Sequence, residues 1–184
     1  MKELSLNVLD ITQNSISAGA DLIYIELTED GSGLLTLSIR DNGCGMSEKT
    51  LERVIDPFYT TRTTRKVGMG IPLLKLAAEQ AGGELTIVSK TREADPVFHG
   101  TEIRATFHTD SIDFTPVGDM VSTLCVIIQG HPEINYVFRH KTPEFDVSLD
   151  TSKVREVLGE GVSLGEHEVL EWIAGYLEQQ YNNE

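Results

Sequence analysis

The sequence lacks any apolar run of about 18 residues, the length that a membrane span needs. Its first ten residues lack the charged, apolar and small-residue sections of a signal peptide. We therefore expect a cytoplasmic protein. Basic residues are also scarce, because 15 lysines and arginines stand against 29 aspartates and glutamates, for a formal net charge of −14. Such a charge repels phosphate backbones and anionic membranes, so neither nucleic acid nor membrane is expected as the main partner.

Cysteine is equally rare. The chain has only Cys44 and Cys125, which lie far apart and form neither a disulfide framework nor a metal-ligand spacing. The five histidines show no ligand pattern either, so a metal held by protein side chains alone is not expected. What the chain does have is 184 residues, of which 40% are hydrophobic, enough for one large domain or for one domain with a small appendage.

Helix and strand patterns alternate along the first 108 residues. Helix formers without glycine or proline fill residues 3–18, and β-rich runs at 22–28 and 34–40 flank a glycine-containing turn, which predicts a hairpin. Ser47 can cap a helix that reaches about residue 55. A further helix over 73–81 and strands over 84–90 and 101–107 follow, whereas the polar, basic segment 60–70 is typical of a mobile loop.

The pattern changes beyond Thr109. Strand-like segments are expected at 124–128, 136–139 and 145–149, followed by helices at 151–158 and 165–181. Asp150 or Thr151 can cap the first of these helices, and Ser163 with Glu166 makes a capping box for the second. We expect an α+β protein with one domain over residues 1–108 and a small α+β appendage over 109–184.

A thin polar stripe runs along the first predicted helix. Its members share one face by their i, i+3 and i+4 spacing, and they are Glu3, Asn7, Asp10, Asn14 and Ser17. Such stripes usually face water. The alternative is that they line a site, and the glycine-rich segments that follow favour it.

Three glycine segments have residue types that suit a nucleotide. Asp41 directly follows a strand, where its carboxylate can accept a hydrogen bond from an exocyclic amine, while Gly43 and Gly45 allow close backbone approach. The sequence Gly68-Met69-Gly70 precedes a helix, whose N-terminal N–H groups suit phosphate oxygens. The third segment, His99-Gly100-Thr101, stands at the start of a predicted strand and provides the Thr101 hydroxyl there. Taken singly, these segments could be a turn, a helix cap or a hinge.

The order and spacing of the motifs carry a resemblance. The segment LDITQNSISAGADLIYIEL…LSIRDNGCGMS resembles the N-box and first glycine box of MutL, gyrase and heat-shock chaperone ATPases. The segment DPFYTTR…VGMGIPLLKLAAEQAGGELTIVS…HGTEIRATF resembles the phenylalanine box, second glycine box and Gly-Thr strand of sensor histidine kinases. The chain is identified as a member of the GHKL superfamily over residues 3 to about 108. The implied fold is the Bergerat ATP-binding fold, a two-layer α/β sandwich.

The resemblance also implies site residues for ATP and Mg²⁺. Asn14 would help to coordinate Mg²⁺, Asp41 would accept the adenine amino group, and Thr101 would support that hydrogen bonding. Other implied ligands line the adenine pocket or meet the phosphates at the end of a lid over 60–69; they are Gly43, Gly45, Met46, Gly68, Met69 and Gly70. The lid cations Arg62, Arg65 and Lys66 would neutralise phosphate, although they could instead form a solvated loop.

Asp10 stands where several branches of the superfamily place a catalytic glutamate. Aspartate keeps the carboxylate with a shorter reach, so general-base work is possible. Met69 and Pro72 depart from the usual GLGL pattern of the second glycine box, and Pro72 fits a first helical turn.

Two functions remain open. Few residues precede the first helix, so no phosphoacceptor hairpin is expected there, and a kinase or ATPase would act in trans on a partner protein. Alternatively, the chain is an ATP-responsive regulatory module in which nucleotide orders the lid and the appendage reads that order. His131 and His140 could accept a phosphoryl group, although lone histidines are usually structural. A homodimer through the C-terminal part is a further possibility.

Overall fold

A computed structural model describes residues 3–54, 69–159 and 161–182. The strands are β1 (Leu22–Glu29), β2 (Leu34–Asp41), β3 (Leu85–Lys90), β4 (Gly100–His108), β5 (Asn135–Lys141) and β6 (Asp146–Asp150). The helices are α1 (Leu4–Ser17), α2 (Glu48–Val54), α3 (Gly70–Gln80), α4 (Met120–Gly130), α5 (Thr151–Leu158) and α6 (His167–Asn182). None of these helices is both long and apolar enough to cross a membrane.

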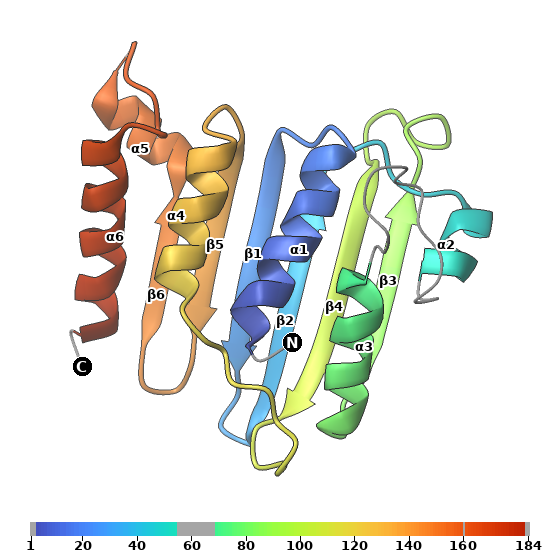
Figure 1. Ribbon diagram of the computed structural model, residues 1–184. Helices are drawn as coiled ribbons and strands as arrows, with labels where there is room; N and C mark the ends of the chain where they lie inside the picture. Colours follow the sequence, from blue (N-terminus) through green and yellow to red (C-terminus); the bar gives the residue numbers. More distant parts are fainter. Residues whose placement is uncertain (1–2, 55–68, 160, 183–184) are drawn as a thin grey trace.

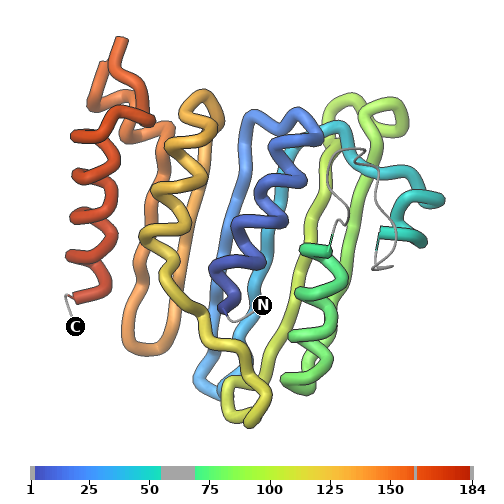
Figure 2. Tube along the Cα trace, viewed as in Figure 1, coloured from blue at the N-terminus to red at the C-terminus, as the bar shows by residue number. Residues whose placement is uncertain are grey.

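The strands form one sheet in the order β3-β4-β2-β1-β5-β6, and four helices lie side by side over one face of it (Figure 1). From one edge of the sheet to the other these helices are α3, α1, α4 and α6, an arrangement that the chain trace in Figure 2 also shows. The predicted two-layer α/β sandwich is therefore confirmed.

Strands β1 and β2 form the predicted hairpin. They pair antiparallel from Ile23 opposite Asp41 to Glu29 opposite Leu35. The turn between them is closed by Asp30, whose carboxylate accepts hydrogen bonds from the backbone N–H groups of Ser32 (2.9 Å) and Leu34 (3.1 Å). Because Asp41 ends β2, the register of this hairpin fixes where its carboxylate lies.

The C-terminal residues continue the same sheet. Strand β5 pairs parallel with β1, from Leu22 opposite Asn135 to Thr28 opposite Lys141, and β6 then pairs antiparallel with β5. Strand β1 is consequently a central strand with a partner on each side. Residues 109–184 thus complete one side of the sheet and its helical layer.

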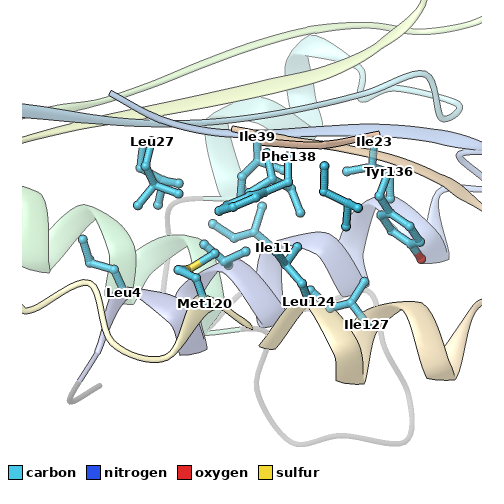
Figure 3. Packing of buried hydrophobic residues seen from close by; sticks show 14 of the residues in the cluster. Leu4, Ile11, Ile23, Leu27, Ile39, Met120, Leu124, Ile127, Tyr136 and Phe138 are labelled. Carbon is cyan, nitrogen blue, oxygen red and sulfur yellow. The ribbon is translucent and has the colours of Figure 1, made fainter. Parts of the chain in front are cut away.

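Alternate residues of the strands point into a core beneath the helices. In β1, Ile23, Ile25 and Leu27 are fully buried, as the period of two predicts for a strand with one covered face. Figure 3 shows these strand residues facing helix residues across the core, with labels on Leu4, Ile11, Ile23, Leu27, Ile39, Met120, Leu124, Ile127, Tyr136 and Phe138.

The strand expected at 124–128 is wrong, because these residues form the middle of α4. Asp119 caps this helix by accepting a hydrogen bond from Ser122 N (2.9 Å). Leu124, Ile127 and Ile128 are buried at helical spacing, but a run of only five apolar residues does not reveal its period. The other predicted helices and strands are confirmed, with boundaries that differ by a few residues.

The segment before α4 also closes the start of α1. Glu3 provides no side-chain cap, and the Leu4 and Ser5 N–H groups instead donate to the carbonyls of Pro116 (2.9 Å) and Val117 (2.8 Å). Four N–H groups at the start of a helix need outside partners, and this segment satisfies two of them. The first helix is therefore tied to the C-terminal part of the chain.

Candidate functional site

The site is built around Asp41, which ends β2 with its side chain buried. Ser15 on α1 donates its hydroxyl hydrogen to Asp41 Oδ2 (2.6 Å). The backbone N–H groups of Gly43 and Thr101 both donate to Asp41 Oδ1, at 2.9 Å and 3.3 Å. Three donors, from α1, from the glycine loop and from β4, thus meet at one carboxylate.

The donors around Asp41 leave room for one more. A carboxylate offers roughly four acceptor positions. Among the residues that the structure describes, two donors bond to Oδ1 and only Ser15 bonds to Oδ2, so within this set one acceptor position on Oδ2 remains. A buried acceptor with a vacant position is suited to an N–H group of a ligand, because its other hydrogen bonds fix its orientation in advance.

Three glycines allow close backbone packing around the site, and Gly43 lies against the carboxylate itself. A Cβ on Gly43 would lie 2.9 Å from Ala18 Cβ and 3.1 Å from Asp41 Oδ1. Gly45 has a φ of +72°, and a Cβ there would lie 1.8 Å from Lys90 O. Gly100 has a φ of +123°, and its Cβ would lie 2.0 Å from Asp41 O. Only glycine fits these positions, so the predicted glycine loop and the start of β4 are packed against each other.

Thr101 and Met46 meet through a residue that the sequence did not reveal. Ser89 on β3 shares a hydrogen bond with Thr101 Oγ1 (2.8 Å), and its hydroxyl accepts one from Met46 N (2.8 Å). Ser89 also donates to Gly100 O (2.9 Å). Thr101 therefore reaches Asp41 through its backbone, while its hydroxyl lies in the Ser89 network.

A second loop, residues 91–99 between β3 and β4, clamps the glycine loop. Arg92 N donates to Cys44 O (3.0 Å), and His99 donates from Nδ1 to Gly43 O (2.6 Å). On the other side, Cys44 N donates to Ala18 O (2.9 Å). The glycine loop is therefore held by backbone from α1 and from loop 91–99.

The polar face of α1 is not a simple solvent-facing stripe. Asn7 is 1% exposed, and among the described residues neither atom of its side-chain amide has a hydrogen-bond partner. Asp10 and Asn14 are half-buried, and only Ser17 is exposed. Most of this face is thus covered by protein.

Asp10 lies against the start of α3. A Cβ on Gly70 would lie 3.0 Å from Asp10 Cβ and 3.7 Å from Asp10 Oδ2. Met69 precedes the helix, is 43% exposed and provides no side-chain cap. The N-terminal end of α3 thus lies beside Asp10 without a side-chain oxygen of its own, and such an end favours anions.

Several predicted residues fall outside the described ranges. They belong to the predicted lid, and they are Arg62, Arg65, Lys66 and Gly68. Their role in binding phosphate stays a prediction. Within the described ranges, no three His, Cys, Asp or Glu side chains group into a metal site, so a Mg²⁺ ion would need ligands beyond such a cluster.

Sequence reasoning missed the contacts that Ser15, Ser89 and His99 make within the site, although His99 stands in one of the predicted glycine segments. Ser15 left a signal, because it follows Leu4, Val8 and Ile11 on the buried face of α1, where a polar residue needs a partner. Ser89 and His99 left none, since their contacts depend on how loops meet across the sheet.

The profile of the family "Histidine kinase-, DNA gyrase B-, and HSP90-like ATPase" matches residues 1–111. A sensor protein of Shewanella frigidimarina is 32% identical over 108 residues, which cover 58% of this chain and 15% of that protein. The DNA mismatch repair protein MutL of Pelotomaculum thermopropionicum is 33% identical over 93 residues, 47% of this chain and 15% of that protein. The chain thus matches only a small share of these relatives.

One solved structure shows the fold of nearly the whole chain. The MutL ATPase domain of Aquifex aeolicus, complexed with ADP, matches 98% of this chain and 70% of that chain, with a TM-score of 0.54 and 11% identity. The match includes the part beyond residue 111.

Proposed function

The chain belongs to the family of histidine kinase-, DNA gyrase B- and HSP90-like ATPases, and we propose that it binds Mg·ATP and uses it as a kinase or ATPase acting on a partner protein. The vacant acceptor position on Asp41 Oδ2 is the observation that carries this proposal. An adenine amino group is the donor that this position would select. Gly43, Gly45 and Met46 would line the base, and Ser15 and Thr101 would orient the carboxylate.

The phosphates would extend from Asp41 along α1 towards α3. The N-terminus of α3, where Met69 provides no side-chain cap, offers backbone N–H groups, and a helix N-terminus is a common phosphate site. Asn14 would supply an amide oxygen to Mg²⁺, with phosphate oxygens and water as the other ligands. Mg²⁺ bound there would neutralise phosphate charge. Gly68 and the lid cations Arg62, Arg65 and Lys66 would complete the site.

Asp10 is our candidate general base. It lies one helical turn before Asn14 on the same face of α1, and it touches the start of α3, where the terminal phosphate would lie. Asp10 would orient and deprotonate a water molecule or a partner's hydroxyl or imidazole.

A regulatory module is the second candidate. The capping of α1 by Pro116 and Val117 favours it, because a shift of α1 on nucleotide binding would reach the chain that leads into α4. In this reading residues 1–108 bind nucleotide and residues 109–184 respond to it, with slow chemistry or none. A protein partner, a homodimer and a cytoplasmic location are parts of both proposals.

An assay with γ-labelled ATP and Mg²⁺ separates these candidates. The kinase or ATPase proposal expects labelled partner protein or free phosphate, and Asp10→Asn should lower turnover at least about 100-fold while nucleotide affinity stays within a few-fold. Glu3→Gln, at the other end of the same helix face, is the matched control and should keep full turnover. ATP binding without either product would favour the regulatory module.

A further inference from the structure

A groove lies on the face of the sheet that the helices leave uncovered. Register places Val88 opposite Glu102, Glu102 opposite Arg40, and Arg40 opposite Tyr24, so these four residues form a row across β3, β4, β2 and β1. Their neighbours Ile23, Ile39 and Ile103 point into the core, so the row points the other way. A cavity of about 360 Å³ lies over this row, with Leu22, Lys90, Val97, Phe98 and His99 among its other lining residues.

The groove has an apolar rim that is fixed in place. Val97 and Phe98 are each 75% exposed, and Val88 beside them is 64% exposed. Their loop is ordered by Asp95, whose Oδ1 accepts hydrogen bonds from Val97 N (3.2 Å) and Phe98 N (2.9 Å). An aromatic side chain held exposed by a rigid loop is typical of a binding anchor, because little conformational entropy is lost on association.

In the floor of the groove Arg40 lies opposite Glu102, but no ion pair between them is present. The Arg40 guanidinium stacks over the Tyr24 ring, 4.4 Å from its centroid. Lys90 pairs with Asp95 (3.5 Å), and Glu102 accepts a hydrogen bond from Ser38 (3.4 Å), but no ion pair within 4 Å involves Arg40 among the residues that the structure describes. The exposed guanidinium thus keeps N–H donors for an incoming carboxylate.

We propose that this groove docks a segment of a partner protein that carries an aspartate or glutamate next to a large apolar side chain. The apolar side chain packs against Phe98 and Val88, and the carboxylate pairs with Arg40. Nucleic acid fits less well than this segment, because a row of backbone phosphates would pass Glu102, whereas the segment brings a single carboxylate to Arg40. The proposal does not rest on ATP binding. Asp41 and Thr101 also line the cavity, but the row from Val88 to Tyr24 that would contact the partner lies on the sheet face away from the helices.

Selection of a random peptide library on the full chain tests the docking proposal. The expected binders share an acidic residue beside a leucine, methionine or aromatic residue. Phe98→Ser and Arg40→Gln should each weaken a synthetic consensus peptide at least about 10-fold by fluorescence polarisation. Val157→Ser, at an exposed valine on α5, and Arg104→Gln, on the same sheet face outside the groove, are matched controls and should leave binding unchanged.

A second peptide, with its acidic residue changed to the amide, completes a double-mutant cycle. The amide peptide should bind the wild-type chain more weakly than the acidic peptide, by the same factor as that caused by Arg40→Gln. The Arg40→Gln chain should bind both peptides equally. Binders without acidic residues, or binders unaffected by Phe98→Ser, would overturn the proposal. A wild-type dimer that Phe98→Ser dissociates in sedimentation would assign the groove to a second copy instead. Thermal unfolding and Mg·ATP binding should be measured for the same variants. These controls distinguish a failure of the docking proposal from a failure of the proposed nucleotide site.

Discussion

Replacing Asp41 with asparagine tests the nucleotide site at its centre. The two backbone N–H groups of Gly43 and Thr101 cannot turn away, so the asparagine oxygen must take the place of Oδ1. The asparagine NH₂ group then takes the place of Oδ2, where the Ser15 hydroxyl can rotate and accept from it. The variant should therefore fold, with a stability within about 1 kcal/mol of the wild type.

The same substitution changes the hydrogen-bonding character of the vacant position on Oδ2 from acceptor to donor. In the proposed complex the wild-type oxygen accepts a hydrogen bond from the adenine amino group, whereas Asp41→Asn would present a donor to that amino group. A hydrogen bond to a charged group contributes about 1.5–3 kcal/mol, so its loss should weaken ATP binding roughly 10- to 150-fold. The clash of two donors adds to this loss.

Inosine triphosphate makes the test specific, because its base carries a carbonyl where adenine has the amino group. The wild type should prefer ATP, and Asp41→Asn should shift the ratio of affinities towards inosine triphosphate by at least about 10-fold. Titration calorimetry of both nucleotides with both proteins measures this shift. If the variant folds and keeps the wild-type preference, Asp41 does not contact the base and our assignment of the site is wrong.

Three further predictions concern stability, measured by urea unfolding. Gly45→Ala should lower the free energy of unfolding by at least about 2 kcal/mol, because of the positive φ and the contact with Lys90. Gly175→Ala, in open space on α6, should raise it by about 0.5–1 kcal/mol. Equal effects of the two substitutions would contradict the described loop. Burial lowers the pKa of His140 from 6.5 to about 4, so the unfolded chain binds the proton at a higher pH than the folded chain does. The free energy of unfolding should therefore fall by up to about 3 kcal/mol as the pH drops from 6.5 to 4, and it should fall less in His140→Gln. Asn7→Leu should leave stability unchanged or raise it by about 1 kcal/mol, since the buried Asn7 amide has no hydrogen-bond partner among the described residues. A clear loss of stability would show that the amide does have a partner.

The sequence predicted most helices and strands because their signals are local. The α1 helix, the β1–β2 hairpin and the caps at Ser47, Asp150 and Glu166 all follow from residues within a few positions of each other. The C-terminal strands were placed in the same way. The sequence also predicted Asp41, Gly43 and Gly45 as neighbours in one loop, because a motif fixes their spacing along the chain.

What the sequence could not predict depends on contacts between distant segments. Ser15 and Thr101 meet Asp41 only after α1 and β4 pack against β2. The parallel pairing of β5 with β1 likewise has no local signature, so residues 109–184 were expected as an appendage rather than as part of the sheet. The helical period of α4 was hidden because its apolar residues are contiguous.

The pairing of β1 with β5 has a consequence for how the chain folds during synthesis. Leu22 pairs with Asn135, which leaves the ribosome more than a hundred residues later. Until then one edge of β1 is unpaired, and the first N–H groups of α1 lack their acceptors, the carbonyls of Pro116 and Val117. Contacts so distant in sequence form slowly, and an unpaired strand edge is prone to aggregation. The nascent N-terminal half therefore depends on the rest of the chain to become a stable protein.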